Sequence, residues 1–477
     1  MPGMTHLAPD LLDRFRAIVG PKGWTSDASD LAPHLVEWRD LYQGSTLLLL
    51  KPANTEEVAA IVKLANETGT KLVPQGGNTG LVGGGIPFDK NDEIIVSLTR
   101  MNRVRAIDAL NDTITVDAGC VLQQVQNAAR EAGRLYPMSI GSEGSCTIGG
   151  NLSTNAGGNA VLRYGNSRDL VLGLEVVLAD GRVWNGLRGL RKDNTGYDLK
   201  DLFIGAEGTL GIITGAVLKL YPLPKAYGTA FTAVTSPQAA IELLSLAKDL
   251  SGGAVTGFEL LPRIGLDFVV KHTPGCHDPI ADRHPWYVLM ELSAQRDDGS
   301  IDSVLETLLE QGLERGLVLD AAIAQSETQR AAFWKIREAM SGAQKPEGGS
   351  IKCDISVPVS SMPAFIEKAG KAVEAVIPGV RIVAFGHIGD GNVHFNPSQP
   401  VDWKREDFLA KWDEVSTIIH DIAHEFNGSI SAEHGLGRMK VDEITHYKSA
   451  LEIEMMQRIK RDFDPNNILN PGKVVRA

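Results

Sequence analysis

Residues 74–84 read PQGGNTGLVGG, and this stretch decides how the first half of the chain is interpreted. Residues 71–75 have the pattern of a short strand, which runs directly into the glycines. Glycine lacks a Cβ, so the loop backbone can approach a bound group closely and present its N–H groups to it. The stretch therefore suits a pyrophosphate. The candidate binding residues are Pro74, Gly76, Gly77, Asn78, Thr79, Gly80 and Leu81.

Two more glycine loops follow, one over residues 141–158 and one over residues 205–214. A single loop of this kind is compatible with plain flexibility. Three in one domain favour a phosphate or flat-ring ligand instead. The further candidate binding residues are Ser142, Gly149, Gly150, Thr154, Asn155, Gly157, Gly158, Gly208 and Ile213.

The commoner phosphate and hydrolase motifs are missing from the sequence. It contains no GxxxxGK[ST], which excludes a P-loop NTPase, and no GxGxxG, which disfavours a Rossmann dinucleotide site. The lack of GxSxG lowers the case for an α/β-hydrolase. A formal net charge of −12 argues against a nucleic-acid-binding protein.

The cysteines and the N-terminus bear on the compartment. Four scattered cysteines without a CxxC pair indicate neither a zinc ribbon nor a disulfide framework, and we expect reduced thiols and a cytoplasmic protein. The first 20 residues have charges within an amphipathic helical pattern, unlike a signal peptide. No run of about 18 uncharged apolar residues predicts a membrane span.

Hydrophobic periodicity predicts an α+β protein in four parts. These are an N-terminal helical segment (1–45), a nucleotide-binding domain (46–224), a substrate and metal domain (225–440) and a C-terminal segment that packs back (441–477). The predicted helices are 55–68, 121–132, 236–250, 301–315, 326–340, 362–376 and 403–426. The predicted strands are 47–51, 71–75, 94–98, 113–118, 172–179, 286–292, 351–357 and 381–387.

The second half contains a candidate metal site in the stretch GHIGDGNVHFN, residues 386–396. Asp390-Gly391 is a strong two-residue hairpin signal, which would place His387 opposite His394 on one face, with Asn396 beside them. Two histidines alone are equally compatible with structural roles. Glu433 and His434, in SAEHGLG, add an acid and a base. Two imidazoles and one carboxylate suit zinc, although manganese or iron would also fit.

The three glycine loops resemble those of the vanillyl-alcohol-oxidase-type flavoproteins, the FAD-linked oxidases. The resemblance covers about residues 45–224 and returns in NILNPGK, which adds Asn470 as a cofactor residue. It implies a two-part α+β FAD-binding domain. Members that attach FAD covalently often have a histidine where this chain has Asn78, so we expect FAD to bind without a covalent link.

The segments GHIGDGNVHFN and SAEHGLGR resemble the metal segments of the D-2-hydroxy-acid dehydrogenase branch of that family. The resemblance implies that His387, His394 and Glu433 bind a metal ion and that His434 is the catalytic base. The implied reaction is metal-assisted deprotonation of a 2-hydroxyl group with hydride transfer to flavin N5.

Within that branch the D-2-hydroxyglutarate-oxidising members are the most similar, which the stretch RKDNTGYD (191–198) also supports. The resemblance implies that Arg337, Ser341 and Lys352 hold a second carboxylate, with Ser341 where threonine is usual; charge-assisted contacts suit that group. We therefore expect D-2-hydroxyglutarate or D-malate as substrate, with Asn396 as a further substrate residue.

Several alternatives stay open at this point. The chain could oxidise D-lactate or glycolate, could be a metal-free FAD-linked alcohol or carbohydrate oxidase, or could be a non-catalytic flavoprotein subunit. A zinc hydrolase would have no use for three flavin loops. The electron acceptor, an electron-transfer flavoprotein or the quinone pool, is not fixed by the sequence, and a homodimer is compatible with it.

Overall fold

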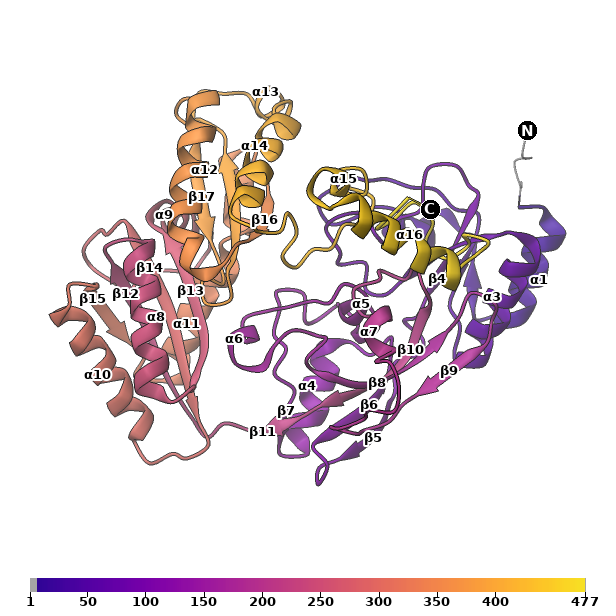
Figure 1. Ribbon diagram of the computed structural model, residues 1–477, viewed down its shortest axis with the longest axis horizontal. Coiled ribbons are helices and arrows are strands. Elements are labelled where there is room, and N and C mark those ends of the chain that lie inside the picture. Colours follow the sequence, from indigo (N-terminus) through magenta and orange to yellow (C-terminus); the bar gives the residue numbers. More distant parts are fainter. Residues whose placement is uncertain (1–6, 477) are drawn as a thin grey trace. The chain divides into compact units, whose positions relative to one another are not determined.

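The computed structural model describes residues 7–476, so the first six residues of the predicted N-terminal segment lie outside it. The chain forms two compact units (Figure 1). Of the described residues, the first unit contains 7–158, 165–223 and 433–476, and the second contains 159–164 and 224–432. The segment that returns to the first unit thus starts before the predicted residue 441.

The first unit contains two larger sheets. In the four-stranded sheet, of order β1-β2-β4-β3, the strands β2, β4 and β3 run parallel. The five-stranded sheet, of order β5-β6-β10-β8-β9, is antiparallel. The strands of the first unit are β1 (Trp24–Thr25), β2 (Leu49–Leu50), β3 (Lys71–Gln75), β4 (Glu93–Ser97), β5 (Val104–Asp108), β6 (Thr113–Asp117), β7 (Arg134–Leu135), β8 (Val171–Val177), β9 (Val183–Gly186), β10 (Ile212–Lys219) and β11 (Tyr221–Pro222).

Short helices flank these sheets. They are α1 (Pro9–Val19), α2 (Ala28–Leu31), η1 (Ala32–His34), α3 (Thr55–Thr68), α4 (Leu122–Glu131), α5 (Ile148–Ser153), α7 (Lys200–Phe203), α15 (Ile444–Tyr447) and α16 (Ala450–Phe463). Asn54 caps α3 by accepting the N–H of Glu57, and Gly69 ends it in the left-handed conformation. These local signals explain why α3 has the predicted bounds.

The second unit is built on a four-stranded antiparallel sheet of order β13-β14-β12-β15. Helices α8 and α10 pack on one face and α9 and α11 on the other, with an apolar core on each side (Figure 1). These elements are β12 (Ala226–Val234), α8 (Pro237–Ser251), β13 (Val255–Pro262), α9 (Arg263–His272), β14 (Trp286–Ala294), α10 (Ser300–Glu314), β15 (Val318–Ile323) and α11 (Glu327–Ala339).

A three-stranded sheet, of order β16-β18-β17, joins the edge of the larger sheet through a bridge between Leu260 and Gly386. Helices α12 and α14 pack together, and α14 lies against β16. The remaining elements of the second unit are α6 (Val161–Tyr164), η2 (Gly342–Glu347), β16 (Cys353–Ser356), η3 (Val359–Ser361), α12 (Met362–Val376), β17 (Arg381–Phe385), β18 (Asn392–Ser398), α13 (Arg405–Leu409) and α14 (Trp412–Glu425).

Most predicted elements are confirmed to within a few residues, and the fold is α+β as expected. The single predicted helix 403–426 is wrong, because the chain forms α13 and α14 with a turn between them. Phe408 is fully buried, and the N–H of Lys411 closes the turn on its carbonyl at 3.0 Å. Among the helices of residues 7–476, none has the length and apolar character to cross a membrane.

The C-terminal segment packs onto the first unit through backbone hydrogen bonds and a buried ammonium group. Leu72 on β3 accepts the N–H of Asn470 and donates to the carbonyl of Ile468, each at 2.8 Å. The Lys460 ammonium is buried and donates to Asp464 at 2.5 Å. It also donates to the carbonyls of Thr209 (2.8 Å) and Leu469 (2.9 Å).

We predict that Lys460→Met lowers the free energy of unfolding of the first unit by about 3–5 kcal/mol, because it leaves a buried carboxylate without its cation. Urea unfolding followed by circular dichroism measures this. Lys448→Met is the control, since Lys448 forms an exposed i,i+4 pair with Glu452 and its loss should leave the free energy of unfolding nearly unchanged. An equal loss in both variants would contradict the role of the buried ammonium.

Candidate active site

The first glycine loop packs directly on the second. A Cβ on Gly77 would overlap the backbone of Ser145, and one on Gly76 would overlap the Thr147 hydroxyl. Within residues 7–476, no group accepts a hydrogen bond from the backbone N–H groups of residues 76–81. A row of N–H groups with no protein acceptor fits the phosphate oxygens of a dinucleotide. The loop therefore fits the expected FAD.

Asn78 stands where family members with covalently attached FAD often have a histidine, and here its contacts are structural. Its backbone is left-handed, with φ of 52°. Its side-chain amide donates to the carbonyls of Pro33 at 3.0 Å and Val36 at 2.9 Å. The amide nitrogen is not a nucleophile, so non-covalent FAD stays our prediction.

The first and third loops meet at Asn470. Its side-chain amide donates to the carbonyl of Gly84 at 3.0 Å and to that of Glu207 at 2.8 Å. Gly208 has φ of 72°, and a Cβ there would lie 3.0 Å from the Pro74 ring. Three parts of the chain that are far apart in sequence thus converge.

The other predicted cofactor residues lie on or beside the second and third loops. Gly149 packs against Ala118, and the Thr154 hydroxyl donates to the carbonyl of Gly150 at 3.1 Å. The Asn155 side chain accepts the N–H of Arg168 at 3.0 Å. Ser142, Gly157 and Gly158 lie on the second loop, and Ile213 lies on β10.

The predicted register of the histidine hairpin is wrong. His394 on β18 pairs with Phe385, not with His387, and Asn396 pairs with Val383. The backbone of Gly386 instead forms two hydrogen bonds with Leu260, which draws the chain away from β18 and makes the turn longer than two residues. The two imidazoles are nevertheless neighbours, with ring centroids 5.8 Å apart.

A buried carboxylate lies behind each of these imidazoles. Glu259 on β13 contacts His387 Nδ1 at 2.6 Å, and Asp354 on β16 pairs with His394 Nδ1 at 3.5 Å. Both acids are only 1% exposed. Burial alone would raise the pKa of Glu259, but the charges of His387 and Arg337 lower it to about 2. The carboxylate is therefore ionised throughout the physiological pH range.

Glu259 also binds the candidate substrate arginine. Its second oxygen accepts from Arg337 Nε at 2.6 Å, and Arg337 lies over the Phe385 ring at 5.0 Å. An Nη atom of Arg337 is 3.4 Å from His387 Nε2. One carboxylate thus holds a predicted metal ligand and a predicted substrate residue at the same time.

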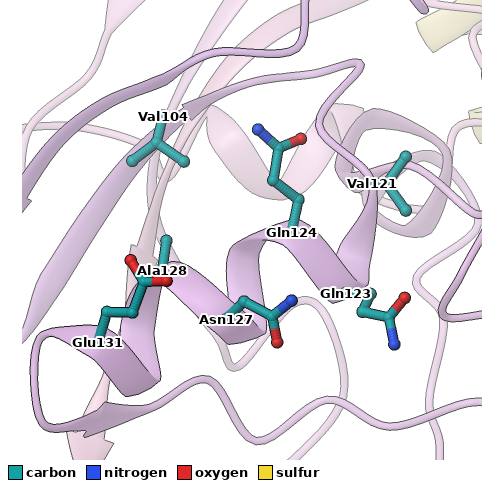
Figure 2. A pocket seen from close by; sticks show the side chains of 7 residues that line it. All are labelled: Val104, Val121, Gln123, Gln124, Asn127, Ala128 and Glu131. Carbon is teal, nitrogen blue, oxygen red and sulfur yellow. The ribbon is translucent and has the colours of Figure 1, made fainter.

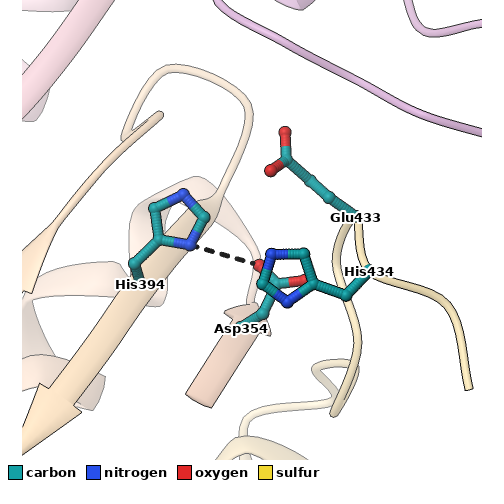
Figure 3. Close-up of side chains that lie close together, drawn as sticks. All are labelled: Asp354, His394, Glu433 and His434. Atoms are coloured by element: carbon teal, nitrogen blue, oxygen red, sulfur yellow. Dashed lines mark ion pairs between the residues drawn. The ribbon is translucent and has the colours of Figure 1, made fainter. Parts of the chain in front are cut away.

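The structure brings four potential metal ligands together (Figure 3). Asp354, His394, Glu433 and His434 each offer one ligand atom, and these atoms lie within 4.8 Å of one another. Glu433 follows directly on Ala432, whose N–H donates to the carbonyl of Asp354 at 3.2 Å. The group includes two of the predicted ligands and the predicted base, and it adds Asp354 where we expected His387.

The remaining predicted substrate residues have different environments. Ser341 lies between the end of α11 and the start of η2 and is exposed. Lys352 precedes β16 and donates to the Gln344 side chain at 3.1 Å. Asn396 is buried on β18, two residues from His394 on the same face.

Sequence reasoning missed Glu259 and Asp354, because neither belongs to a recognised motif. One signal was present in each case. Glu259 is a lone acid in the apolar strand VTGFELLP, and Asp354 is a lone acid in IKCDISV. A charged side chain within a buried strand pattern needs a partner, which marks it as a candidate for a site.

A pocket of about 490 Å³ lies elsewhere on the first unit, along α4 (Figure 2). Its lining consists of Val104, Val121, Gln123, Gln124, Asn127, Ala128 and Glu131. None of these residues was predicted to bind a ligand, and Glu131 is the only ionisable group among them. The pocket offers no set of groups for acid–base or redox chemistry.

Comparisons with known proteins agree with these features. The chain matches the model of the FAD binding domain over residues 46–186 and that of the FAD linked oxidases, C-terminal domain, over residues 223–474. It is 40% identical over 476 residues to a probable mitochondrial D-2-hydroxyglutarate dehydrogenase of Oryza sativa subsp. indica, covering 99% of this chain and 83% of that protein. It is 37% identical over 449 residues to a D-2-hydroxyglutarate dehydrogenase of Xanthomonas citri pv. viticola, covering 94% and 93%.

The fold is also found among solved structures. The structure of p-cresol methylhydroxylase with bound substrate aligns with a TM-score of 0.76 and covers 98% of this chain and 96% of that one. At 16% sequence identity the likeness concerns the fold alone. It confirms the vanillyl-alcohol-oxidase-type architecture expected from the glycine loops.

We predict that Gly77→Ala weakens FAD binding at least about 10-fold, since the added Cβ must push the first loop off the second; a shift of 1.4 kcal/mol suffices for that factor. Titration of the apoprotein with FAD, followed by flavin fluorescence, measures the dissociation constant. Gly141→Ala is the control, because a Cβ there would meet no atom within 4 Å and its φ is not positive. Unchanged FAD affinity in Gly77→Ala would contradict the assignment.

Proposed function

The chain belongs to the FAD-linked oxidase family as an FAD-dependent D-2-hydroxy-acid dehydrogenase, and from this premise we propose that it oxidises D-2-hydroxyglutarate to 2-oxoglutarate with a divalent metal ion. When bound, FAD accepts the hydride and the metal ion polarises the substrate hydroxyl. The proposed ligands are His387, His394 and Glu433, and zinc is the first choice of metal.

The carboxylate behind each imidazole is the observation that supports the metal most strongly. Metal-binding histidines characteristically give their second ring nitrogen to a carboxylate, which fixes the tautomer and the ring orientation. Glu259 and Asp354 both contact Nδ1, so Nε2 of His387 and of His394 is the ring nitrogen that would bind a metal ion.

In this proposal one side chain is the base, one is a further metal ligand and one orients its neighbours. His434 is the proposed base, since an imidazole is the side chain suited to taking the proton of the substrate hydroxyl near neutral pH. Asp354 is the alternative fourth ligand, since it lies within the same group. Glu259 keeps the imidazole of His387 and the guanidinium of Arg337 in fixed orientations.

Arg337 supports a dicarboxylic substrate. Arg337 is 8% exposed. Its Nε donates to Glu259 and one terminal nitrogen is 3.4 Å from His387 Nε2, which leaves the other terminal nitrogen for a further acceptor. A buried cation of this kind favours a carboxylate over a neutral group. Lys352 is our second proposed contact with the distal carboxylate, with Ser341 and Asn396 as further contacts. D-Malate is the closest alternative substrate.

For the electron acceptor we propose only a class of partner. An external acceptor, either an electron-transfer flavoprotein or the quinone pool, must reoxidise the flavin between turnovers. Oxidation of D-lactate or glycolate is the rival activity within the same family. A metal-free FAD-linked oxidase is the rival without the histidine site.

We predict that under anaerobic conditions D-2-hydroxyglutarate and D-malate bleach the flavin faster than D-lactate and glycolate do. The reason is that only the dicarboxylates have a second carboxylate for Arg337. Stopped-flow absorbance at the flavin band gives the rate and the apparent affinity for each acid. Faster bleaching by D-lactate or glycolate would reject the dicarboxylate assignment and leave the FAD and metal assignments intact.

We predict that His394→Ala loses its stoichiometric metal, whereas Glu259→Gln binds it about 10- to 100-fold more weakly, as expected for a group that orients a ligand. Chelator competition and elemental analysis of the purified protein provide the readout. His272→Ala is the matched control, because His272 contacts Glu347 at 2.6 Å in another part of the same unit. Full metal retention in His394→Ala would refute the ligand set.

A further inference from the structure

A buried carboxylate with no role in the proposed chemistry lies in the third glycine loop. Glu207 belongs to the third glycine loop, and its side chain points to the loop that follows His434. Its two oxygens accept the N–H of Leu436 at 2.8 Å and the N–H of Gly437 at 2.9 Å. One carboxylate thus binds two consecutive backbone amides only two and three residues after His434.

Glu207 packs so closely against residues 435–437 that position 435 cannot accommodate a Cβ. Gly435 has φ of 76°, and a Cβ there would lie 2.6 Å from a Glu207 carboxylate oxygen. The N–H of Arg438 donates to the carbonyl of Val82 in the first glycine loop at 3.1 Å. The backbone after His434 is therefore fixed on one side by the third loop and on the other by the first.

The backbone of Glu207 is itself unusual. Its φ is 50°, a left-handed conformation that glycine and asparagine adopt far more readily than glutamate. The Asn470 amide holds its carbonyl at 2.8 Å, and its own N–H donates to Ser153 at 2.8 Å. A glycine would adopt this conformation with less strain, so the glutamate at position 207 must be explained by what its side chain does.

A gain in stability does not explain why position 207 is a glutamate. Burial raises the pKa of Glu207 to about 7, against the lowering effect of the two N–H groups and of Lys473 and Lys440. An acid whose pKa is higher in the folded state than in the unfolded state makes the free energy of unfolding fall as the pH rises between those two values. Above pH 7 the ionised carboxylate therefore costs the fold stability.

We propose that Glu207 is a positioning residue, which holds residues 435–437 against the flavin loops and thereby sets where Glu433 and His434 lie. This inference rests on the proposed function of those two residues. The geometry makes the third glycine loop serve two purposes: its backbone lines the flavin site, and its one carboxylate orients the base and a metal ligand.

The test compares Glu207→Gln with Glu175→Gln in the full chain reconstituted with FAD and zinc. Glutamine is nearly isosteric, but its NH₂ group would face a backbone N–H, so one of the two hydrogen bonds becomes a repulsion. Glu175 is the matched control, because it is equally buried in the same unit. Its partners are Thr55, Arg105 and Thr214, and none of them belongs to residues 433–437.

We expect Glu207→Gln to keep its FAD, to bind zinc at least about 10-fold more weakly and to show at least about 10-fold slower flavin reduction by D-2-hydroxyglutarate at saturating substrate, as for other supporting residues of metal sites. Its thermal midpoint at pH 8 should not fall below that of the wild type. Glu175→Gln should match the wild type in zinc affinity and reduction rate.

Zinc affinity and reduction rate within twofold of the wild type in Glu207→Gln would overturn the proposal, as would equal losses in Glu175→Gln. A wild-type protein that binds no zinc would instead reject the proposed function. Should Glu207→Gln fail to fold, Gly435→Ala replaces it, because the added Cβ displaces the same loop from the other side. Normal zinc binding and reduction in that variant would also overturn the proposal.

Discussion

A buried charge must be paired, and this constraint shapes both halves of the molecule. In the second unit, Glu259 has its two oxygens on an imidazole and a guanidinium, each at 2.6 Å. Neither the histidine nor the arginine can change its orientation without removing one of the two partners of that buried carboxylate. The pairing gives the proposed metal site its rigidity before any metal binds, and preorganisation of this kind is what a catalytic site requires.

The first unit meets the same constraint by different means. Its first glycine loop has backbone N–H groups without a protein acceptor among residues 7–476, while Asn470 and Lys460 bind carbonyls of the first and third loops. The C-terminal segment supplies both side chains, so the returning residues complete the cofactor domain and do not merely cover it. The glycines are needed because the loops pack backbone on backbone, with no room for a Cβ at Gly76 or Gly77.

Much of the fold could be predicted from local signals. Helix α3 has the predicted bounds because Asn54 and Gly69 cap it, and β3 is a short apolar strand that ends in glycines. The hairpin register could not be predicted, because it depends on Gly386 pairing with Leu260, a contact between residues 126 positions apart. The turn signal of Asp390-Gly391 is local and cannot report such a pairing.

The candidate site also combines residues that local signals predict with residues that depend on long-range contacts. Its histidines and Glu433 follow from motifs, whereas Glu259, Asp354 and Glu207 act through partners that only the folded chain reveals. Crystals of the zinc-loaded protein, measured at the zinc absorption edge, would show whether these two histidines bind the metal ion. We expect one anomalous peak about 2.0–2.1 Å from Nε2 of both His387 and His394, with each Nδ1 still on its carboxylate. A peak that contacts neither Nε2, or no peak at all, would contradict this expectation.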